Sequence, residues 1–281
     1  MKKILAYVLM SALLSCEEVV IIELPSAQNL ITIESWLSSL NETQTVRVSQ
    51  STGFSEELQV RPVTNAEVVI QSRLGIILRF SHTNNGIYAS NSMFAGEVGQ
   101  EYRLRISIEN EPELRSDWER MEDQVAINNL TLVNSFEEND PDNAGEQFTI
   151  FFPKVLRRDP AESENYYRWV FYKDRMKYTE PESITVQDDR LFNGSLIPND
   201  FRAFGYNEEQ EIIVELQSIT KGAYNFLSLL KEQITSLGTS NGTTPANIMG
   251  NISFQSDEVN DLVLGYFGTV AISRDTVIAR P

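Results

Sequence analysis

The clearest structural signal in the chain is the stretch Tyr102-Arg103-Leu104-Arg105-Ile106-Ser107-Ile108, in which apolar and polar residues alternate strictly. Such alternation sends successive side chains to opposite faces of a β-strand. One face of this strand carries Tyr, Leu and Ile, and the other carries Arg and Ser. The stretch therefore predicts a sheet with one buried face and one solvated face.

Shorter runs of the same kind fill residues 30–110 and are separated by Gly, Asn and Pro. They read Leu30-Ile31-Thr32-Ile33-Glu34, Thr45-Val46-Arg47-Val48-Ser49, Ala66-Glu67-Val68-Val69-Ile70, Ile76-Ile77-Leu78-Arg79-Phe80 and Gly86-Ile87-Tyr88-Ala89. Strands at this spacing predict a β-sandwich over residues 30–110. The series Asn65-Ala66-Glu67-Val68, Gly86-Ile87-Tyr88 and Gly99-Gln100-Glu101-Tyr102-Arg103-Leu104 resembles bacterial immunoglobulin-like and transthyretin-like modules.

The second half of the chain is also predicted to be rich in strands. Residues 111–124 are polar and charged, and we interpret them as a hinge into a second domain at 125–281. Its expected strands lie at 127–133, 148–152, 166–172, 184–186 and 212–216, with a final hairpin formed by 264–268 and 276–278. Apolar residues at three- and four-residue steps predict one amphipathic helix at about 221–237, with Thr220 as its N-cap and Gly238 as its stop. The predicted fold class is mainly β, with an N-terminal sandwich and a β-rich C-terminal domain that carries one helix.

The N-terminal sixteen residues resemble a bacterial lipoprotein signal. Lys2 and Lys3 precede an apolar run from Ile4 to Leu14, which is shorter than the roughly 20 residues that span a bilayer. The single cysteine of the chain, Cys16, stands where such signals place the lipidated residue. We expect residues 1–15 to be a signal peptide and residues 16–29 to be a lipidated tether.

Composition limits the classes of partner. The chain has 281 residues, 40 Asp and Glu against 23 Lys and Arg, and a formal net charge of −17. Such a chain repels phosphate backbones and anionic lipid surfaces, so we expect no nucleic-acid partner and membrane attachment through lipid alone. Nothing in the sequence indicates a cofactor.

Residues suited to catalysis or metal binding are few. The one histidine, His82, lies beside a predicted hairpin turn, where a solvated polar residue is the usual finding. Asp140 and Asp142 are weak calcium candidates, because their loop has Ala144 and Phe151 where an EF-hand loop needs oxygen ligands. A solvated acidic turn explains them better, and we predict no metal and no catalytic residues.

A ligand platform is a further hypothesis. Asp188 and Asp189, with the aromatic residues Phe192, Phe204 and Tyr206, offer carboxylates beside stacking surfaces. Paired carboxylates can hydrolyse glycosides, although adjacent acids arise by chance in so acidic a chain and aromatic residues are more often core. Asp275-Thr276-Val277 looks like a bacterial O-glycosylation acceptor, a motif short enough to recur by chance.

Five segments in series resemble a Bacteroidetes lipoprotein family that is classed as a domain of unknown function. They are Glu164-Asn165-Tyr166-Tyr167-Arg168, Asp188-Asp189-Arg190-Leu191-Phe192-Asn193-Gly194, residues 214–227, residues 245–252, and Leu264-Gly265-Tyr266-Phe267-Gly268. Genes of that family often neighbour TonB-dependent outer-membrane receptors. The resemblance therefore implies an outer-membrane lipoprotein that assists such a receptor, and it supplies no catalytic residues.

The leading expectation is thus a non-enzymatic accessory or substrate-binding lipoprotein of the bacterial outer membrane, with a TonB-dependent receptor as partner. Two alternatives remain open, a surface hydrolase that uses carboxylates and a structural or adhesive surface module. A concave pocket with two carboxylates roughly 5 to 9 Å apart would favour the hydrolase, whereas a flat surface with no pocket would favour the adhesive module.

Overall fold

The structure, a computed structural model, describes residues 30–51, 60–139, 147–180, 183–236, 247–256 and 262–280, and it is mainly β with one α-helix among them. The mainly β prediction with a single helix is confirmed. The strands are β1 (Ile31–Ser38), β2 (Thr45–Gln50), β3 (Arg61–Pro62), β4 (Ala66–Ser72), β5 (Ile77–Asn84), β6 (Ile87–Ser90), β7 (Glu101–Ile108), β8 (Leu114–Ser116), β9 (Glu119–Arg120), β10 (Ile127–Asn139), β11 (Gln147–Arg158), β12 (Tyr166–Lys173), β13 (Met176–Lys177), β14 (Thr185–Asp188), β15 (Leu196–Asp200), β16 (Glu211–Ile219), β17 (Ile252–Phe254) and β18 (Leu264–Ile278), and the helix is α2 (Lys221–Ser236).

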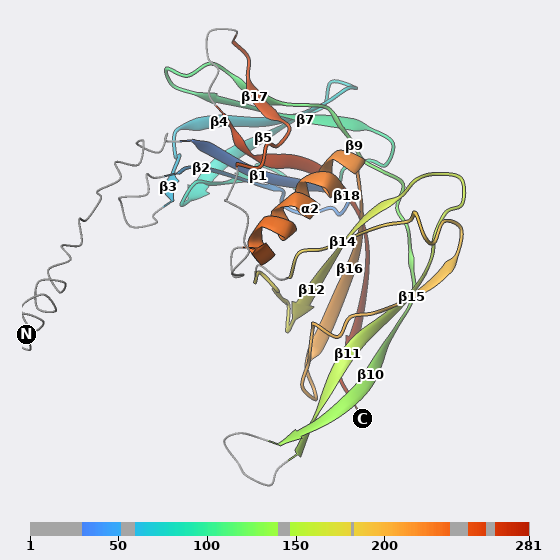
Figure 1. The fold of residues 1–281 in the computed structure, drawn as a ribbon. Coiled ribbons are helices and arrows are strands. Elements are labelled where there is room, and N and C mark those ends of the chain that lie inside the picture. Colours follow the sequence, from blue (N-terminus) through green and yellow to red (C-terminus); the bar gives the residue numbers. More distant parts are fainter. Residues whose placement is uncertain are drawn as a thin grey trace, which may run out of the picture.

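The N-terminal strands form two layers around one core (Figure 1). They pair in the order β1-β2-β6-β5-β4-β7-β8-β17, so the sheet folds over on itself. On β7, Tyr102, Leu104 and Ile106 are buried while Arg103, Arg105 and Ser107 are not, as the alternation predicts. The resemblance to immunoglobulin-like and transthyretin-like modules stays a prediction.

The segment 111–124, expected to be a hinge, is part of this N-terminal unit. Its strands β8 and β9 both pair with β7. Met121 is fully buried in the N-terminal core, and Glu119 is almost fully buried. The segment is polar because its turns are partly exposed, and it does not form a hinge between two domains.

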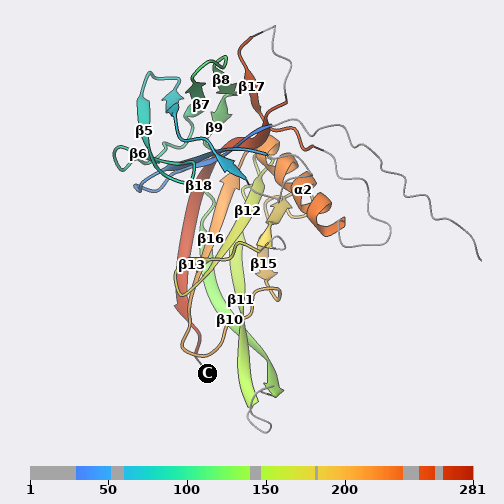
Figure 2. The same ribbon diagram turned by 90° about the vertical axis from the view of Figure 1, so that its left-hand side faces the viewer.

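The expected C-terminal hairpin is a single strand, β18, of 15 residues. Its first half pairs in parallel with β1 and its second half pairs antiparallel with β16. Residues from Tyr266 to Ser273 are all buried, because this stretch is covered on both faces. Gly265 and Gly268, which suit turns, bulges or close backbone approach, here permit close contact with β1. Figure 2 shows β18 running from the N-terminal layers to the far end of the C-terminal sheet.

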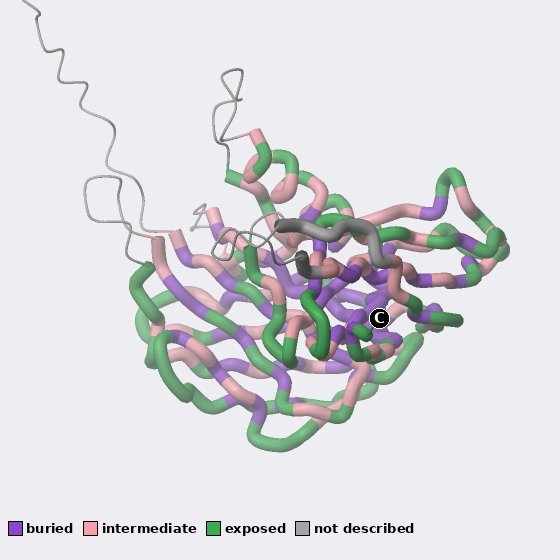
Figure 3. Tube along the Cα trace, turned by 90° about the horizontal axis from the view of Figure 1, so that it is seen from below, coloured by how far each residue is buried: buried purple, intermediate pink, exposed green. Residues whose placement is uncertain are grey.

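The C-terminal half consists of the strands β12, β16 and β18 with other elements on both faces. On one face, the three-stranded sheet β10-β11-β15 encloses a core that includes Trp169, Phe171, Val214 and Phe204. On the other face, α2 packs on β18 through Ala223 and Leu227. The buried residues lie in the interior between these elements, and the exposed residues lie at the rim (Figure 3). Because β18 pairs with β1 of the N-terminal sheet and with β16 of the C-terminal half, it belongs to both halves of the molecule.

The start of α2 agrees with the sequence prediction. Thr220 is the N-cap, since its Oγ1 accepts a hydrogen bond of 3.2 Å from the backbone N–H of Ala223. The helix is described to Ser236, and the expected stop at Gly238 lies outside the described residues.

Candidate functional site

A cleft of about 770 Å³ lies between β1, β12 and α2. Alternation along β1 explains one wall, because Ile33 and Leu37 point into the N-terminal core while Glu34 and Trp36 face the cleft. The same rule places Arg168 of β12 on the cleft side. This volume is typical of small-molecule sites.

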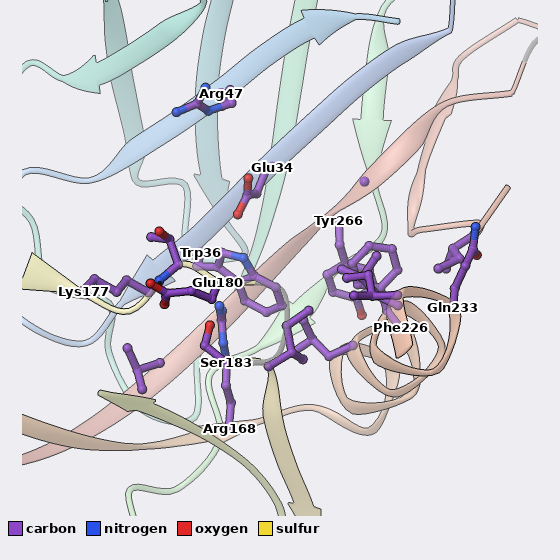
Figure 4. Close-up of a pocket in the computed structure, with 18 of the residues that line it drawn as sticks. Glu34, Trp36, Arg47, Arg168, Lys177, Glu180, Ser183, Phe226, Gln233 and Tyr266 are labelled. Carbon is purple, nitrogen blue, oxygen red and sulfur yellow. Dashed lines mark hydrogen bonds between the residues drawn. The ribbon is translucent and has the colours of Figure 1, made fainter. Parts of the chain in front are cut away.

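Three aromatic rings and a guanidinium group form a continuous series along the cleft. The guanidinium of Arg168 lies 4.7 Å from the centroid of the Trp36 ring. Trp36 stacks on Tyr266 with centroids 5.9 Å apart, and Tyr266 stacks on Phe226 of α2 with centroids 5.0 Å apart. Figure 4 shows the charged side chains on one side of Trp36 and the rings beside α2 on the other. The cleft thus has a charged end and an apolar end.

A buried carboxylate fixes the central ring of this series. The hydroxyl of Tyr266 donates a hydrogen bond of 2.6 Å to Glu119, which also accepts hydrogen bonds from the Thr220 hydroxyl (2.6 Å) and from Asn251 Nδ2 (3.1 Å). Burial raises the pKa of Glu119, although these three donors act in the opposite direction. Burial also raises the pKa of Tyr266, and the neighbouring Glu119 carboxyl adds to that shift. The network joins β9, β18 and α2 behind the cleft.

Cationic side chains dominate the charged end. Arg47, Arg168 and Lys177 line it together with Glu34 and Glu180. In the described part of the chain, none of the three cations forms an ion pair. A second hollow of about 410 Å³ opens from the same end and shares all three cations with the cleft.

The environment of these cations affects their protonation. Burial lowers the pKa of Arg168, whereas the charges of Glu34 and Glu215 raise it. Desolvation and the charge of Arg168 lower the pKa of Lys177, even though much of its side chain is accessible to solvent. The carboxylate of Glu215 already has other partners, because Arg274 Nε (2.9 Å), the Tyr172 hydroxyl (3.1 Å) and a glutamine amide donate hydrogen bonds to it. A bound anion would relieve the mutual repulsion between Arg168 and Lys177.

The apolar end is formed by the apolar face of α2. Ala223 and Leu227 are buried, and Leu227 lines the cleft together with Phe226, Leu230 and Ile234, which are only partly buried. The apolar helix face that the sequence predicts therefore serves two purposes, packing at its beginning and lining the cleft further along.

The residues of the predicted ligand platform do not meet in one site. Phe204 and Tyr206 are 5% and 0% exposed and belong to the C-terminal core, where Phe204 stacks on Phe171 with centroids 3.9 Å apart. Asp189 is buried, and its Oδ2 accepts a hydrogen bond of 2.7 Å from the backbone N–H of Asn165. Their roles are explained by packing and backbone hydrogen bonding.

The other two platform residues lie nearer the surface. Asp188 Oδ2 accepts hydrogen bonds from Arg190 Nε (2.8 Å) and from the Tyr224 hydroxyl (3.1 Å). Although partial burial opposes the shift, these contacts lower the pKa of Asp188. Phe192 follows in a partly exposed turn. None of the five platform residues lines the cleft.

Several predicted sites lie beyond the described residues. Cys16, Asp140 and Asp142 are among them. Within the described ranges, no three His, Cys, Asp or Glu side chains cluster closely enough to hold a metal ion. In those same ranges, no helix has the length and apolar character needed to cross a membrane. Thr276 of the glycosylation motif is exposed on β18.

Sequence reasoning did not select Trp36, Arg168 or Lys177. Two signals were present in the printed sequence. Trp36 is a large aromatic residue on the otherwise polar face of its strand, and Arg168 interrupts an apolar run between Tyr167 and Trp169. Both are large residues on the face that a one-sided strand leaves to solvent, which identifies a candidate surface but not its partner.

The chain belongs to the family of domains of unknown function DUF4249. The match covers residues 17–276, which includes every element that forms the cleft. No curated protein matches the chain. Membership in DUF4249 thus supplies a relationship without an assigned activity, and the cleft must be interpreted from its own chemistry.

Proposed function

We propose that this DUF4249 protein is a non-catalytic binding lipoprotein of the bacterial outer membrane that works with a TonB-dependent receptor. The cleft is the single observation that supports a binding role. It combines unpaired cations with an aromatic series, and buried hydrogen bonds hold that series in place. Preformed sites of this kind bind ligands without a large cost of ordering.

The proposed location depends on Cys16. An acylated cysteine at the start of the mature chain would hold the protein at a lipid surface, because each buried methylene contributes about 0.8 kcal/mol. Confinement to that surface raises the effective concentration of the protein near a receptor. A weak interface with the barrel would then be sufficient.

Substitution of Cys16 tests the anchor. Cys16→Ala removes the sulfur that would carry the lipid, so we expect the protein to move from the membrane fraction to the soluble fraction. Ser15→Ala is the matched control, since it keeps the cysteine and a small residue before it. Membrane association of the Cys16→Ala protein equal to that of the control would contradict the proposed anchor.

Co-purification tests the partnership. The tagged full-length protein, extracted from native membranes in mild detergent, should recover an outer-membrane receptor barrel identifiable by mass spectrometry. A chain that is recovered repeatedly without any barrel would contradict the receptor role.

The two alternatives receive less support from the geometry. The hydrolase hypothesis used Asp188 and Asp189, whose carboxylates lie outside the cleft and are engaged with Arg190, Tyr224 and the Asn165 backbone. The cleft has two carboxylates of its own, Glu34 and Glu180, but they share its charged end with three cations, which favours binding of an anion over protonation of a leaving group. The adhesive hypothesis expected a flat surface, whereas the protein has a large concave cleft.

A further inference from the structure

We propose that the cleft binds a monocarboxylate with an extended apolar body, with its carboxylate against Arg168 and its apolar part along Trp36, Tyr266 and α2. This inference rests on the proposed binding function and names the chemical class of the ligand. The order of chemical groups along the cleft, with cations at one end and apolar side chains at the other, supports it.

The charged end selects an anion. In a chain with a formal net charge of −17, the cleft gathers Arg47, Arg168 and Lys177 against Glu34 and Glu180. Among the residues that line the cleft, three cations and two carboxylates leave one positive charge in excess, and the adjoining hollow adds Glu42 and the paired Glu215 and Arg274. A single carboxylate neutralises that excess, whereas a phosphate monoester with a charge of about −1.5 to −2 exceeds it. The planar guanidinium of Arg168 also suits a carboxylate, which accepts two parallel hydrogen bonds.

The apolar end requires more than a small anion. Phe226, Leu230 and Ile234 line the cleft and are only partly buried, whereas Leu227, which also lines it, is buried together with Tyr266. Together with the rings of Trp36 and Tyr266 they form an apolar wall next to the cations. Acetate would leave this wall in water, and a neutral hydrocarbon would leave Arg168 without an anion. A molecule that joins both groups satisfies both ends at once.

Calorimetric titration of the folded full chain with dodecanoate, below its micelle concentration, tests the proposal. Binding should strengthen about fourfold for each added methylene from octanoate to dodecanoate, as expected when each one leaves water. Dodecyltrimethylammonium has the same chain with the opposite charge, and it should bind at least tenfold more weakly. Equal binding of the two amphiphiles, or no binding of dodecanoate, would overturn the ligand class.

Two pairs of variants locate the site. Arg168→Gln should weaken dodecanoate binding at least tenfold, whereas Arg202→Gln is the control, since Arg202 is an exposed arginine near the Phe152 ring outside the cleft. Leu230→Ser should also weaken binding, whereas Leu229→Ser should not, because Leu229 is 54% exposed on the same helix and does not line the cleft.

A folding control keeps this test decisive. If circular dichroism shows that Arg168→Gln does not fold, Lys177→Gln replaces it, because the Lys177 side chain is exposed at the same end. Unchanged dodecanoate affinity in the folded cation variant would overturn the proposed site. The recovery of a receptor barrel does not depend on these titrations. A negative titration would therefore overturn the ligand class without overturning the receptor partnership.

Discussion

At the residue scale, bare backbone is essential where the two halves of the protein join. Gly265 has a φ of +91°, and a Cβ there would overlap the carbonyl group of Ile33 on β1. A Cβ on Gly250 would overlap the carbonyl oxygen of Gly265. These contacts are between main-chain atoms, which cannot move aside as a flexible side chain can.

Gly265→Ala should therefore lower the free energy of unfolding by about 3 kcal/mol or more, because strain at positive φ adds to a backbone clash. Gly75→Ala is a matched control, since Gly75 has a φ of +88° and no atom within 4 Å of the added methyl. The control should cost about 1 kcal/mol. Urea unfolding of both variants measures the difference, and equal losses would show that the contact with Ile33 is unimportant.

Glu119 illustrates a residue whose protonation is linked to stability. Its pKa is raised in the folded protein because burial disfavours the charged form. A carboxyl with a raised pKa in the folded state binds its proton more tightly there than in the unfolded chain. Its contribution to stability is therefore largest at low pH and is lost as the pH rises from near 4.5 through the folded value.

Glu119→Gln removes this ionisation while retaining an acceptor for Tyr266 and Asn251. As the pH rises from about 4 to about 8, the wild type should lose the stability that the protonated Glu119 provides, whereas the variant should not. We therefore expect the free energy of unfolding of the variant to increase relative to that of the wild type over this range. Urea denaturation at several pH values measures this difference. A difference that does not change with pH would contradict the raised pKa.

At the element scale, α2 depends on its first residues. Thr220 caps the helix through the Ala223 backbone N–H, and its hydroxyl also donates to Glu119. Asn251 plays a comparable part for β18, since its side chain both donates to and accepts from the Phe267 backbone, as a neighbouring strand would. The side chains of Thr220 and Asn251 thus satisfy backbone hydrogen-bonding groups of α2 and β18, which lie behind the cleft.

Thr220→Ala should destabilise the protein by about 1 to 2 kcal/mol, because the cap and one hydrogen bond to a buried carboxyl are lost together. Thr220→Ser retains the hydroxyl and should remain within a few tenths of a kcal/mol of the wild type. Thermal unfolding followed by circular dichroism distinguishes the two. If both substitutions cost the same, the threonine methyl matters more than its hydroxyl.

At the scale of the whole molecule, β18 makes the two halves one structural unit. Its residues Phe267 and Ala271 belong to the N-terminal core, whereas Val270 and Ile272 pack beneath α2. Neither half can lose this strand without exposing part of its own core. The same strand contributes Leu264, Gly265 and Tyr266 to the lining of the cleft.

We therefore expect cooperative unfolding of both halves. A variant that keeps only Trp118 reports on the N-terminal half, and a variant that keeps only Trp169 reports on the C-terminal core. In each variant, the urea midpoint measured by fluorescence should coincide with that measured by circular dichroism. Separate midpoints would indicate that the halves unfold independently.

Alternation and helical periodicity predicted most of the local structure. The polar–apolar pattern of 102–108 became a one-sided strand, and the spacing from Ala223 to Ile234 became α2 with its expected cap. The predicted C-terminal hairpin was wrong, because residues 264–268 and 276–278 belong to one strand, in which Gly265 and Gly268 serve close backbone approach and not turns. Their actual role, close contact with Ile33 and Trp36, depends on a partner more than 200 residues away along the chain.

By itself, the sequence determined most of the longer strands, the start of the helix and the inward-facing side chains of the alternating strands, because these follow from periodicity within a few residues. Only the tertiary structure decided that β18 joins the two halves and that Arg168, Trp36, Tyr266 and Phe226 form one series in a cleft. The physical reason is that a strand pattern specifies one buried face and one free face, but not which distant element the free face will meet.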